Sequence, residues 1–227
     1  MGATYALGSA SYGFEWFSRN IGTRQTMFDI GANRGQMALY CSRLVGQAGR
    51  VVAFEPVPDV YADLVRNVST SGCKNIEPVN SAVSRRNGTA TFAFAAEHST
   101  QGKLAECEET YKVTGSNELD VATVTLDSFI CATGRVPDFL KIDVEGGATL
   151  VVEGAAEVLS HWAPAIYMEL HGPDEQSAAA TLMNDFGYHL RALDDSPVAD
   201  PVTRWVSPLV ALKRDSNGSP PRTADGL

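Results

Sequence analysis

The sequence predicts an α/β domain in which a mainly parallel sheet carries helices on both faces. Strand-like and helix-like segments alternate from Met27 onward, and this alternation is typical of parallel sheets. The segment FDIGANRG (28–35) has the pattern of a buried strand, a tight turn and the start of a helix. With 227 residues, 44% of them hydrophobic, the chain is long enough for one domain with a full core.

The first half of the chain alternates regularly. We expect strands at 27–31, 50–55 and 76–83, and helices at 35–45 and 58–70. Pro58 suits the first turn of the second helix because no N–H is needed there, and Gly72 is a stop signal.

The N-terminal segment (residues 1–25) carries aromatic residues among glycines and serines. We expect a short helix at 14–20 that acts as a flap over the domain. Covering a sheet edge is favoured over closing on a substrate, because terminal segments commonly cover edges.

The middle of the chain interrupts the parallel pattern. Residues 88–95 alternate Phe92 and Phe94 with small residues, which predicts a strand. Residues 97–119 are polar and aperiodic and predict a long mobile loop. Residues 121–130 predict a further strand and a short helix, so we expect a β insertion between the third and fourth parallel strands.

The parallel pattern resumes at 138–146. A helix at 148–162, a strand at 165–172 and a helix at 174–186 follow, and strands at 189–193 and 205–212 suit a terminal hairpin. Residues 214–227 are rich in Ser, Gly and Pro, which predicts a disordered tail. The expected division is therefore a segment at 1–25, a domain at 26–213 and a tail at 214–227.

Composition excludes several classes of protein. A net charge of −9 argues against a nucleic-acid surface, which needs a basic face. The four cysteines lie far apart and predict reduced thiols rather than disulfides or a zinc site. No apolar run approaches the roughly 20 residues of a membrane span, and the N-terminus lacks a signal-peptide pattern. We expect a cytoplasmic protein and leave its oligomeric state open.

The FDIGANRG turn suits a cationic nucleoside cofactor. Gly31 and Gly35 allow a positive φ and a close approach of the ligand to the backbone. A carboxylate at Asp29 would repel a pyrophosphate and attract a cation, which favours S-adenosylmethionine. Glu55 ends the next strand, where a carboxylate can accept hydrogen bonds from both ribose hydroxyls.

Acidic residues and a histidine should converge at the carboxyl edge of the sheet. Ligands bind at this edge in open α/β sheets, and side chains two residues apart on a strand share a face. Asp29, the pair Asp143 and Glu145, and the pair Glu169 and His171 are therefore expected in one crevice. Asp143 should face the cofactor or the substrate. His171 is the best general-base candidate because the pKa of imidazole lies near neutrality, although a turn residue is the alternative.

Other roles stay open for these residues. Glu145 either serves the site or caps the following helix. Lys141 either orients a substrate oxygen or, as is more common, pairs with a neighbouring carboxylate. Asp143, Glu145 and Glu169, with His171, also offer ligands that suit Mg²⁺ or Mn²⁺. Binding the cofactor or capping helices is the favoured alternative to a metal.

Several linked motifs resemble the FkbM family of S-adenosylmethionine-dependent methyltransferases. They lie between Met27 and Gly172 in the order FDIGANRG, VVAFEPVPDVYADLVRN, NSAVS, TLDSF, FLKIDVEGGATLVVEGA and PAIYMELH. The resemblance implies a class I methyltransferase fold, with a seven-stranded, mainly parallel sheet and a C-terminal antiparallel hairpin. It also implies methyl transfer to an oxygen, typically a hydroxyl of a small molecule, sugar or glycolipid.

The resemblance also assigns roles to residues. It implies that Asp29, Gly31, Asn33 and Gly35 line the methionine part of the cofactor and that Glu55 binds the ribose. Asn80 and Ser81 would lie near the adenine, and Asp143 beside the methyl-transfer site. The segment Gly146–Ala148 departs from the family, which usually has G-A-E there. His171 would accept the proton of the acceptor hydroxyl, with Asp143 either as the partner of His171 or as the alternative base.

Two other functions compete with this interpretation. One is an NAD(P)-dependent oxidoreductase, against which Asp29 and the missing G-x-G-x-x-G motif both argue. The other is a non-catalytic module that binds the cofactor or uses the fold for protein contacts, and transfers no methyl group.

Overall fold

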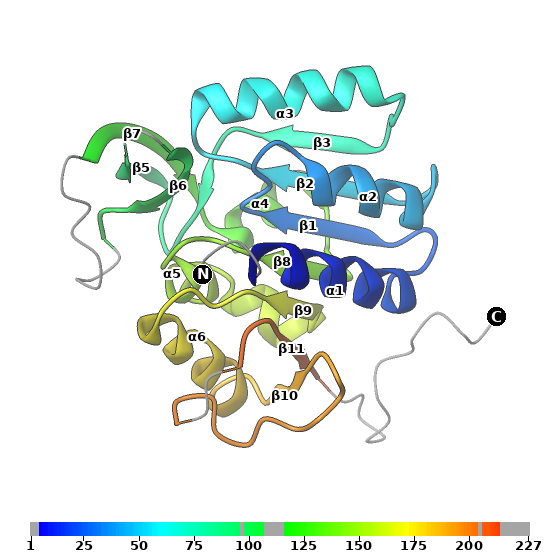
Figure 1. Cartoon of the computed structure of the whole chain (residues 1–227), viewed down its shortest axis with the longest axis vertical. Helices are drawn as coiled ribbons and strands as arrows, with labels where there is room; N and C mark the ends of the chain where they lie inside the picture. Colours follow the sequence, from blue (N-terminus) through cyan, green and yellow to red (C-terminus); the bar gives the residue numbers. More distant parts are fainter. Residues whose placement is uncertain (1–4, 96–97, 107–115, 204–205, 214–227) are drawn as a thin grey trace.

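The computed structural model describes residues 5–95, 98–106, 116–203 and 206–213. Its main sheet has seven strands in the order β10-β11-β9-β8-β1-β2-β3 (Figure 1). The parallel strands are β1 (Thr26–Ile30), β2 (Arg50–Phe54), β3 (Ile76–Val79), β8 (Phe139–Ile142) and β9 (Ala165–Met168). β11 (Leu209–Leu212) runs antiparallel to both β9 and β10 (His189–Ala192). The predicted mainly parallel sheet with a C-terminal antiparallel hairpin is thus confirmed.

A second, four-stranded sheet lies beyond the carboxyl ends of β1, β2 and β3 (Figure 1). Its strands, in the spatial order β4-β7-β5-β6, are β4 (Ala82–Val83), β7 (Ser116–Val124), β5 (Gly88–Ala95) and β6 (His98–Leu104). It forms the predicted insertion between the third and fourth parallel strands. The insertion therefore stands over the edge where a ligand is expected.

Two predictions for this region were wrong. The strand expected at 76–83 is divided, because β3 pairs with β2 in the main sheet while β4 pairs with β7 in the second sheet. The loop expected at 97–119 contains β6 and the start of β7, which pair with the two sides of β5. Pairing to a neighbouring strand outweighs the polar composition there. Residues 107–115 lie outside the described residues, as does the predicted tail.

The helices form two layers. One face of the sheet is covered by α1 (Tyr5–Asn20), α2 (Gln36–Val45) and α3 (Pro58–Ser71), whose apolar residues pack with Met27 and Val51. The other face, which presents Phe28 and Val52, is covered by α4 (Leu126–Thr133), α5 (Ala148–Glu153), the π-helical turn η1 (Val158–Trp162) and α6 (Pro173–Asn184). Successive residues of β1 thus point to opposite layers. The side chain of Asp29 consequently lies on the face of α1 and α2.

The N-terminal helix covers a face of the sheet and not an edge. The ring of Phe17 packs against Tyr167 and Phe139, with centroid distances of 4.7 Å and 5.5 Å. The hydroxyl of Tyr40 in α2 donates to the carbonyl of Phe14 at 3.0 Å. The predicted edge-covering role is therefore corrected, since α1 is part of the core that covers the central strands β8 and β9.

The helix predicted at 148–162 is interrupted at Gly154. A Cβ at this position would lie 2.0 Å from the carbonyl oxygen of Ser84, so the chain passes too close for any side chain. The carboxylate of Asp127 then accepts the N–H groups of Glu157 and Val158 at 3.1 Å and 3.0 Å, which starts the second helical segment.

Candidate active site

The glycine turn after β1 is fixed by its surroundings. Gly31 and Gly35 have φ values of 80° and 85°, a region that disfavours residues with a Cβ. A Cβ on Gly31 would lie 2.0 Å from the carbonyl oxygen of Asp143. The N–H groups of Gly31 and Ala32 donate to the carbonyl of Phe54 at 3.1 Å and 2.9 Å. The turn is therefore tied to the ends of both β2 and β8.

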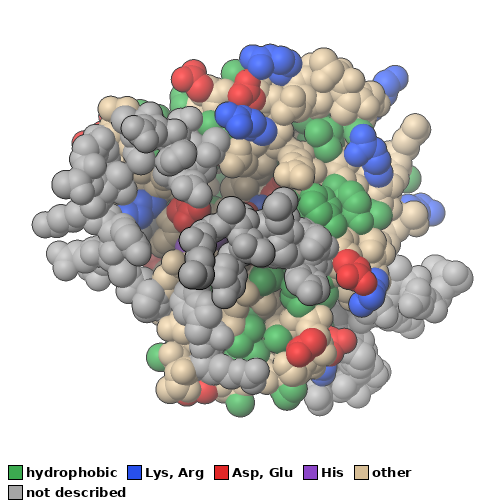
Figure 2. All heavy atoms as spheres, viewed as in Figure 1, with side chains coloured by type: hydrophobic (Ala, Val, Ile, Leu, Met, Phe, Trp, Pro, Cys, Tyr) green, Lys and Arg blue, Asp and Glu red, His purple; other side chains and the backbone are tan. Residues whose placement is uncertain are grey.

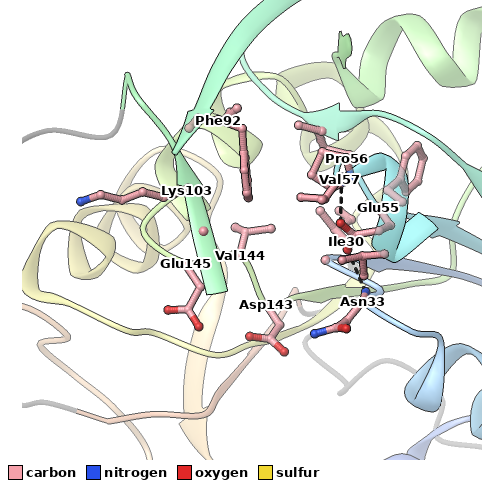
Figure 3. A pocket seen from close by; sticks show the side chains of 18 of the residues that line it. Ile30, Asn33, Glu55, Pro56, Val57, Phe92, Lys103, Asp143, Val144 and Glu145 are labelled. Atoms are coloured by element: carbon pink, nitrogen blue, oxygen red, sulfur yellow. Dashed lines mark hydrogen bonds between the residues drawn. The ribbon is translucent and has the colours of Figure 1, made fainter. Parts of the chain in front are cut away.

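A first cavity opens between this turn and the second sheet (Figure 3). Its walls include the apolar side chains of Ile30, Val57, Phe92 and Val144, with Ser81 at its side. Phe92 comes from β5, so the insertion contributes to the cavity. A concave space with apolar walls and a few polar groups is typical of a small-molecule site.

Glu55 is the carboxylate of the first cavity. Its Oε2 accepts the N–H of Asn33 at 3.0 Å, and its Oε1 accepts the N–H of Val57 at 2.9 Å (Figure 3). Burial raises the pKa of Glu55 to about 7, and the two backbone hydrogen bonds only partly offset that effect. Each oxygen keeps a second lone pair, so the side chain can still accept hydroxyl groups.

Asn80 and Ser81 have different places at this cavity. The Nδ2 of Asn80 donates to the carbonyl oxygens of Glu55 and Pro56 at 2.8 Å and 3.0 Å, so Asn80 braces the turn after β2. Ser81 lines the cavity, and Asn80 is not among its lining residues.

A second cavity lies on the other side of the glycine turn. Its lining includes Phe14 from α1, Met37 from α2, and the charged residues Lys141 and Glu169. Gly31, Asn33 and Asp143 line both cavities. The two cavities thus meet at the turn, and a ligand that passes these shared residues extends from one cavity into the other.

Lys141 is buried between the carboxylates of Asp29 and Asp143. Its Nζ lies 3.2 Å from Oδ1 of Asp29 and 3.1 Å from Oδ2 of Asp143, and it donates to the carbonyl of Gly31 at 3.3 Å. Its side chain is 6% exposed. Burial alone would lower the pKa of Lys141, but the two carboxylates outweigh it and hold the pKa above its usual range. The pairing of Lys141 with neighbouring carboxylates is confirmed.

Asp29 lies beneath the site and not in it. It is 0% exposed and lines neither cavity. Asp29 is directly opposite Lys141 in the pairing of β1 with β8, which places both side chains in one row under α2. Burial raises the pKa of Asp29 against the opposing effect of Lys141. The predicted contact of Asp29 with a cofactor stays a prediction, and in this structure Lys141 lies between Asp29 and the second cavity.

The predicted pairs Asp143 with Glu145 and Glu169 with His171 do meet at one edge. The strands are shorter than expected, because β8 ends at Ile142 and β9 at Met168, so all four residues lie in the following loops. Ligand atoms of Asp143, Glu169 and His171 lie within 4.8 Å of one another and could surround a divalent cation. Glu145 is not in this group, and the Lys141 ammonium already contacts Asp143.

Asp143 and His171 form an ion pair. The Nε2 of His171 lies 2.9 Å from Oδ1 of Asp143, and its Nδ1 lies 3.6 Å from Oε2 of Glu145. Burial would lower the pKa of His171, but these carboxylates raise it to about 9. Burial would raise the pKa of Asp143, but Lys141 and His171 hold it well below its usual range. At neutral pH the pair is therefore a carboxylate and an imidazolium.

The role of Glu175 was not predicted from the sequence. This residue is 0% exposed, and its carboxylate accepts the N–H of Ala148 at 3.3 Å and the N–H of His171. Glu175, and not Glu145, thus caps α5 at the position where the chain lacks the family's usual glutamate. Because Glu175 stands in the first turn of α6, its sequence context resembles an ordinary exposed helix-start acid.

Charged side chains on α3 and the turn before α2 form a small surface cluster. Arg34 and Arg66 both pair with Asp63, at 3.2 Å and 2.7 Å. Figure 2 shows Lys and Arg side chains over the part of this face that holds α2 and α3, with Asp and Glu among them. No helix in the described part of the chain is both long and apolar enough to cross a membrane.

A comparison with models of protein families identifies one family. The family model described as "Methyltransferase FkbM domain" matches residues 29–194. No curated protein sequence matches the chain.

Solved structures share the fold at low identity. A precorrin-6y C5,15-methyltransferase from Geobacter metallireducens is 14% identical, with a TM-score of 0.55 over 90% of this chain and 88% of that one. An FkbM methyltransferase from Methylobacillus flagellatus is 15% identical, with a TM-score of 0.51 over 87% and 50% of the two chains. Fibrillarin from Aeropyrum pernix, with natively bound S-adenosyl-L-methionine, is 18% identical, with a TM-score of 0.50 over 84% and 67%.

Proposed function

The chain belongs to the FkbM family of S-adenosylmethionine-dependent methyltransferases, and from this premise we propose that it methylates an oxygen. The acceptor in this proposal is a hydroxyl group of a small molecule, sugar or glycolipid. The family membership sets aside an oxidoreductase that uses NAD(P). A module that binds the cofactor without catalysis remains the alternative that the experiment below is designed to detect.

The observation that carries the proposal is the pair of joined cavities at the glycine turn. In our proposal the first cavity receives the nucleoside, with Glu55 accepting the ribose hydroxyls and Ser81 near the base. Gly31, Asn33 and Gly35 shape the turn along which the methionine part lies, and Asn80 holds the end of β2 in place. The buried carboxylate of Glu55 supports this assignment, because it lines the first cavity and each of its oxygens accepts only one backbone N–H.

The chemistry requires alignment and the removal of one proton. When bound, S-adenosylmethionine supplies a methyl group that its sulfonium already activates. The chain's main task is to hold the acceptor oxygen in line with that methyl group, and such positioning can supply on the order of 7–11 kcal/mol. Asp143 is the carboxylate that lines both cavities, so we assign it to the reacting centre, where it orients the hydroxyl.

His171 is the proposed proton acceptor, with Asp143 as its partner. A histidine accepts a proton only in its neutral form, and the raised pKa of about 9 keeps His171 charged at neutral pH. On this account turnover rises with pH until His171 has lost its proton. Metal ions have no part in the proposal, because the Lys141 ammonium already supplies positive charge beside Asp143.

Transfer of a radiolabelled methyl group from S-adenosylmethionine to a panel of sugars, glycolipids and hydroxylated metabolites tests the proposal. We expect labelled product from at least one acceptor, with turnover rising between about pH 7 and pH 9. The variant His171→Ala should lower turnover by about 10²–10⁴-fold while its cofactor affinity stays unchanged. Binding of the cofactor without transfer to any acceptor would instead favour the non-catalytic module.

A further inference from the structure

The buried position of Asp29 leaves open which residue holds the ammonium group of the cofactor. A carboxylate that binds this group must reach the ligand, and Asp29 is 0% exposed and lines neither cavity. Lys141 lies between Asp29 and the second cavity, with its Nζ 3.2 Å from Oδ1 of Asp29. The charge of Asp29 is thus already opposed by a buried ammonium of the protein itself.

Asp143 reaches the ligand, but its charge is also opposed. Its Oδ2 lies 3.1 Å from the Lys141 ammonium, and its Oδ1 lies 2.9 Å from Nε2 of His171. A third cation at Asp143 would compete with two that are already in contact. Asp143 is therefore suited to the reacting centre and poorly suited to hold a further ammonium group.

Glu169, unlike Asp29 and Asp143, makes no direct ion pair among the described residues, although Lys141 and His171 act on it electrostatically. It lines the second cavity, across from the glycine turn, and its Oε1 accepts the hydroxyl of Tyr167 at 3.2 Å. Among the described residues, none donates a hydrogen bond to its Oε2. Burial raises the pKa of Glu169, and a bound cation would offset that effect.

The second cavity also suits the other groups of the cofactor's amino-acid part. It joins the nucleoside cavity at Gly31, Asn33 and Asp143, so a chain that leaves the ribose enters it directly. Arg34 and Gln36 also line this cavity and carry hydrogen-bond donors that an α-carboxylate could accept, although Arg34 also pairs with Asp63 at 3.2 Å. A zwitterion thus meets both donors and a carboxylate in this cavity.

We propose that Glu169 binds the α-ammonium group of S-adenosylmethionine, and that Asp29 acts only indirectly by holding Lys141 in place. This inference rests on the proposed function in one respect, that the cofactor is S-adenosylmethionine. It makes Glu169 a binding residue for the cofactor, a role that the glycine-turn motif would otherwise give to Asp29.

Two titrants separate the amino-acid part of the ligand from its nucleoside part. S-adenosylhomocysteine carries the amino acid, whereas 5′-methylthioadenosine has the same nucleoside and thioether without it. We expect Glu169→Gln to weaken binding of S-adenosylhomocysteine about 10- to 100-fold, as measured by calorimetry, because a charged hydrogen bond is lost. Binding of 5′-methylthioadenosine should change by less than about twofold, which also shows that the variant is folded at the cleft.

The variant Asp29→Asn is the matched comparison. Because Asp29 lies under the turn shared by the two cavities, this change should affect both titrants to the same degree. The inference is overturned if Glu169→Gln weakens both titrants equally or neither, or if Asp29→Asn selectively weakens S-adenosylhomocysteine. If the unmodified chain binds neither titrant, the proposed cofactor is wrong and the inference is wrong with it. This outcome is distinct from those above, in which the unmodified chain binds and only a variant changes.

Discussion

At the residue scale, the site depends on how a few charges are buried together. Lys141 joins Asp29, Asp143 and the carbonyl of Gly31, and so links the start of the glycine turn to the end of β8. Removing one partner of a buried ion pair commonly costs about 3–5 kcal/mol, because the other charge is left without compensation. The lysine is therefore part of the framework that positions Asp143.

Glu55 gives a pH-dependent prediction. Its pKa of about 7 lies above the unfolded value, so the folded free protein loses stability from this group as pH rises from about 4.5 to 7. Ribose hydroxyls pair with the ionised form, so cofactor binding should change in the opposite sense. We expect the Kd of S-adenosylhomocysteine to fall about tenfold between about pH 6 and pH 8, as the ionised fraction rises.

The control for this prediction is Glu55→Gln, which cannot ionise. The Kd of this variant for S-adenosylhomocysteine, measured by calorimetry over the same pH range, should be larger than that of the unmodified chain and nearly independent of pH. A variant that keeps the pH dependence of the unmodified chain would show that another group is responsible.

At the element scale, the glycine turn provides a matched pair of substitutions. Gly31 and Gly72 both have positive φ, at 80° and 78°, but a Cβ at Gly31 would meet the carbonyl of Asp143 whereas a Cβ at Gly72 meets nothing within 4 Å. Gly72→Ala should therefore show the cost of the left-handed conformation alone, about 1–2 kcal/mol. Gly31→Ala should lose about 2 kcal/mol or more beyond that, since the strands must move apart.

Urea unfolding of the two variants measures this difference, and calorimetry should show that Gly31→Ala also loses cofactor binding. Equal stability of the two variants would mean that the contact between Gly31 and the loop after β8 is not required.

The elements show which parts of the structure sequence patterns can predict. The glycine turn, the strands β1, β2 and β10 and the helices α2, α3 and α6 have local signals, and their positions were predicted closely. The strand β6 has no such signal, because its polar residues become a strand through pairing with β5. The break at Gly154 depends on the nearby Ser84 carbonyl, which no local pattern reveals.

The candidate site shows the same limit. The convergence of Asp143, Glu145, Glu169 and His171 follows from the rule that parallel strands end at one edge, and the structure brings these residues together. The burial of Asp29 depends on its register with Lys141, a pairing between β1 and β8 that a single sequence does not reveal. The cap that Glu175 in α6 provides for α5 likewise depends on a tertiary contact between the two helices, which a single sequence does not reveal.

At the scale of the whole molecule, two sheets and the helices α1, α2 and α3 enclose the site. The main sheet provides the turn and the carboxylates, the insertion adds Phe92 to the first cavity, and α1 adds Phe14 to the second. The segments that sequence patterns describe least well are thus those that complete the cavities. Because inserted and terminal segments surround the reacting centre, we expect them to determine which hydroxyl is accepted.

The measurement that tests the central claim most directly is calorimetric titration of the purified chain with S-adenosylmethionine. We predict one molecule bound per chain, with a Kd in the range of about 1–100 μM. Adding Mg²⁺ should leave this value unchanged, because Lys141 already supplies positive charge beside Asp143. The absence of binding with or without Mg²⁺ would contradict the assignment of the joined cavities to this cofactor.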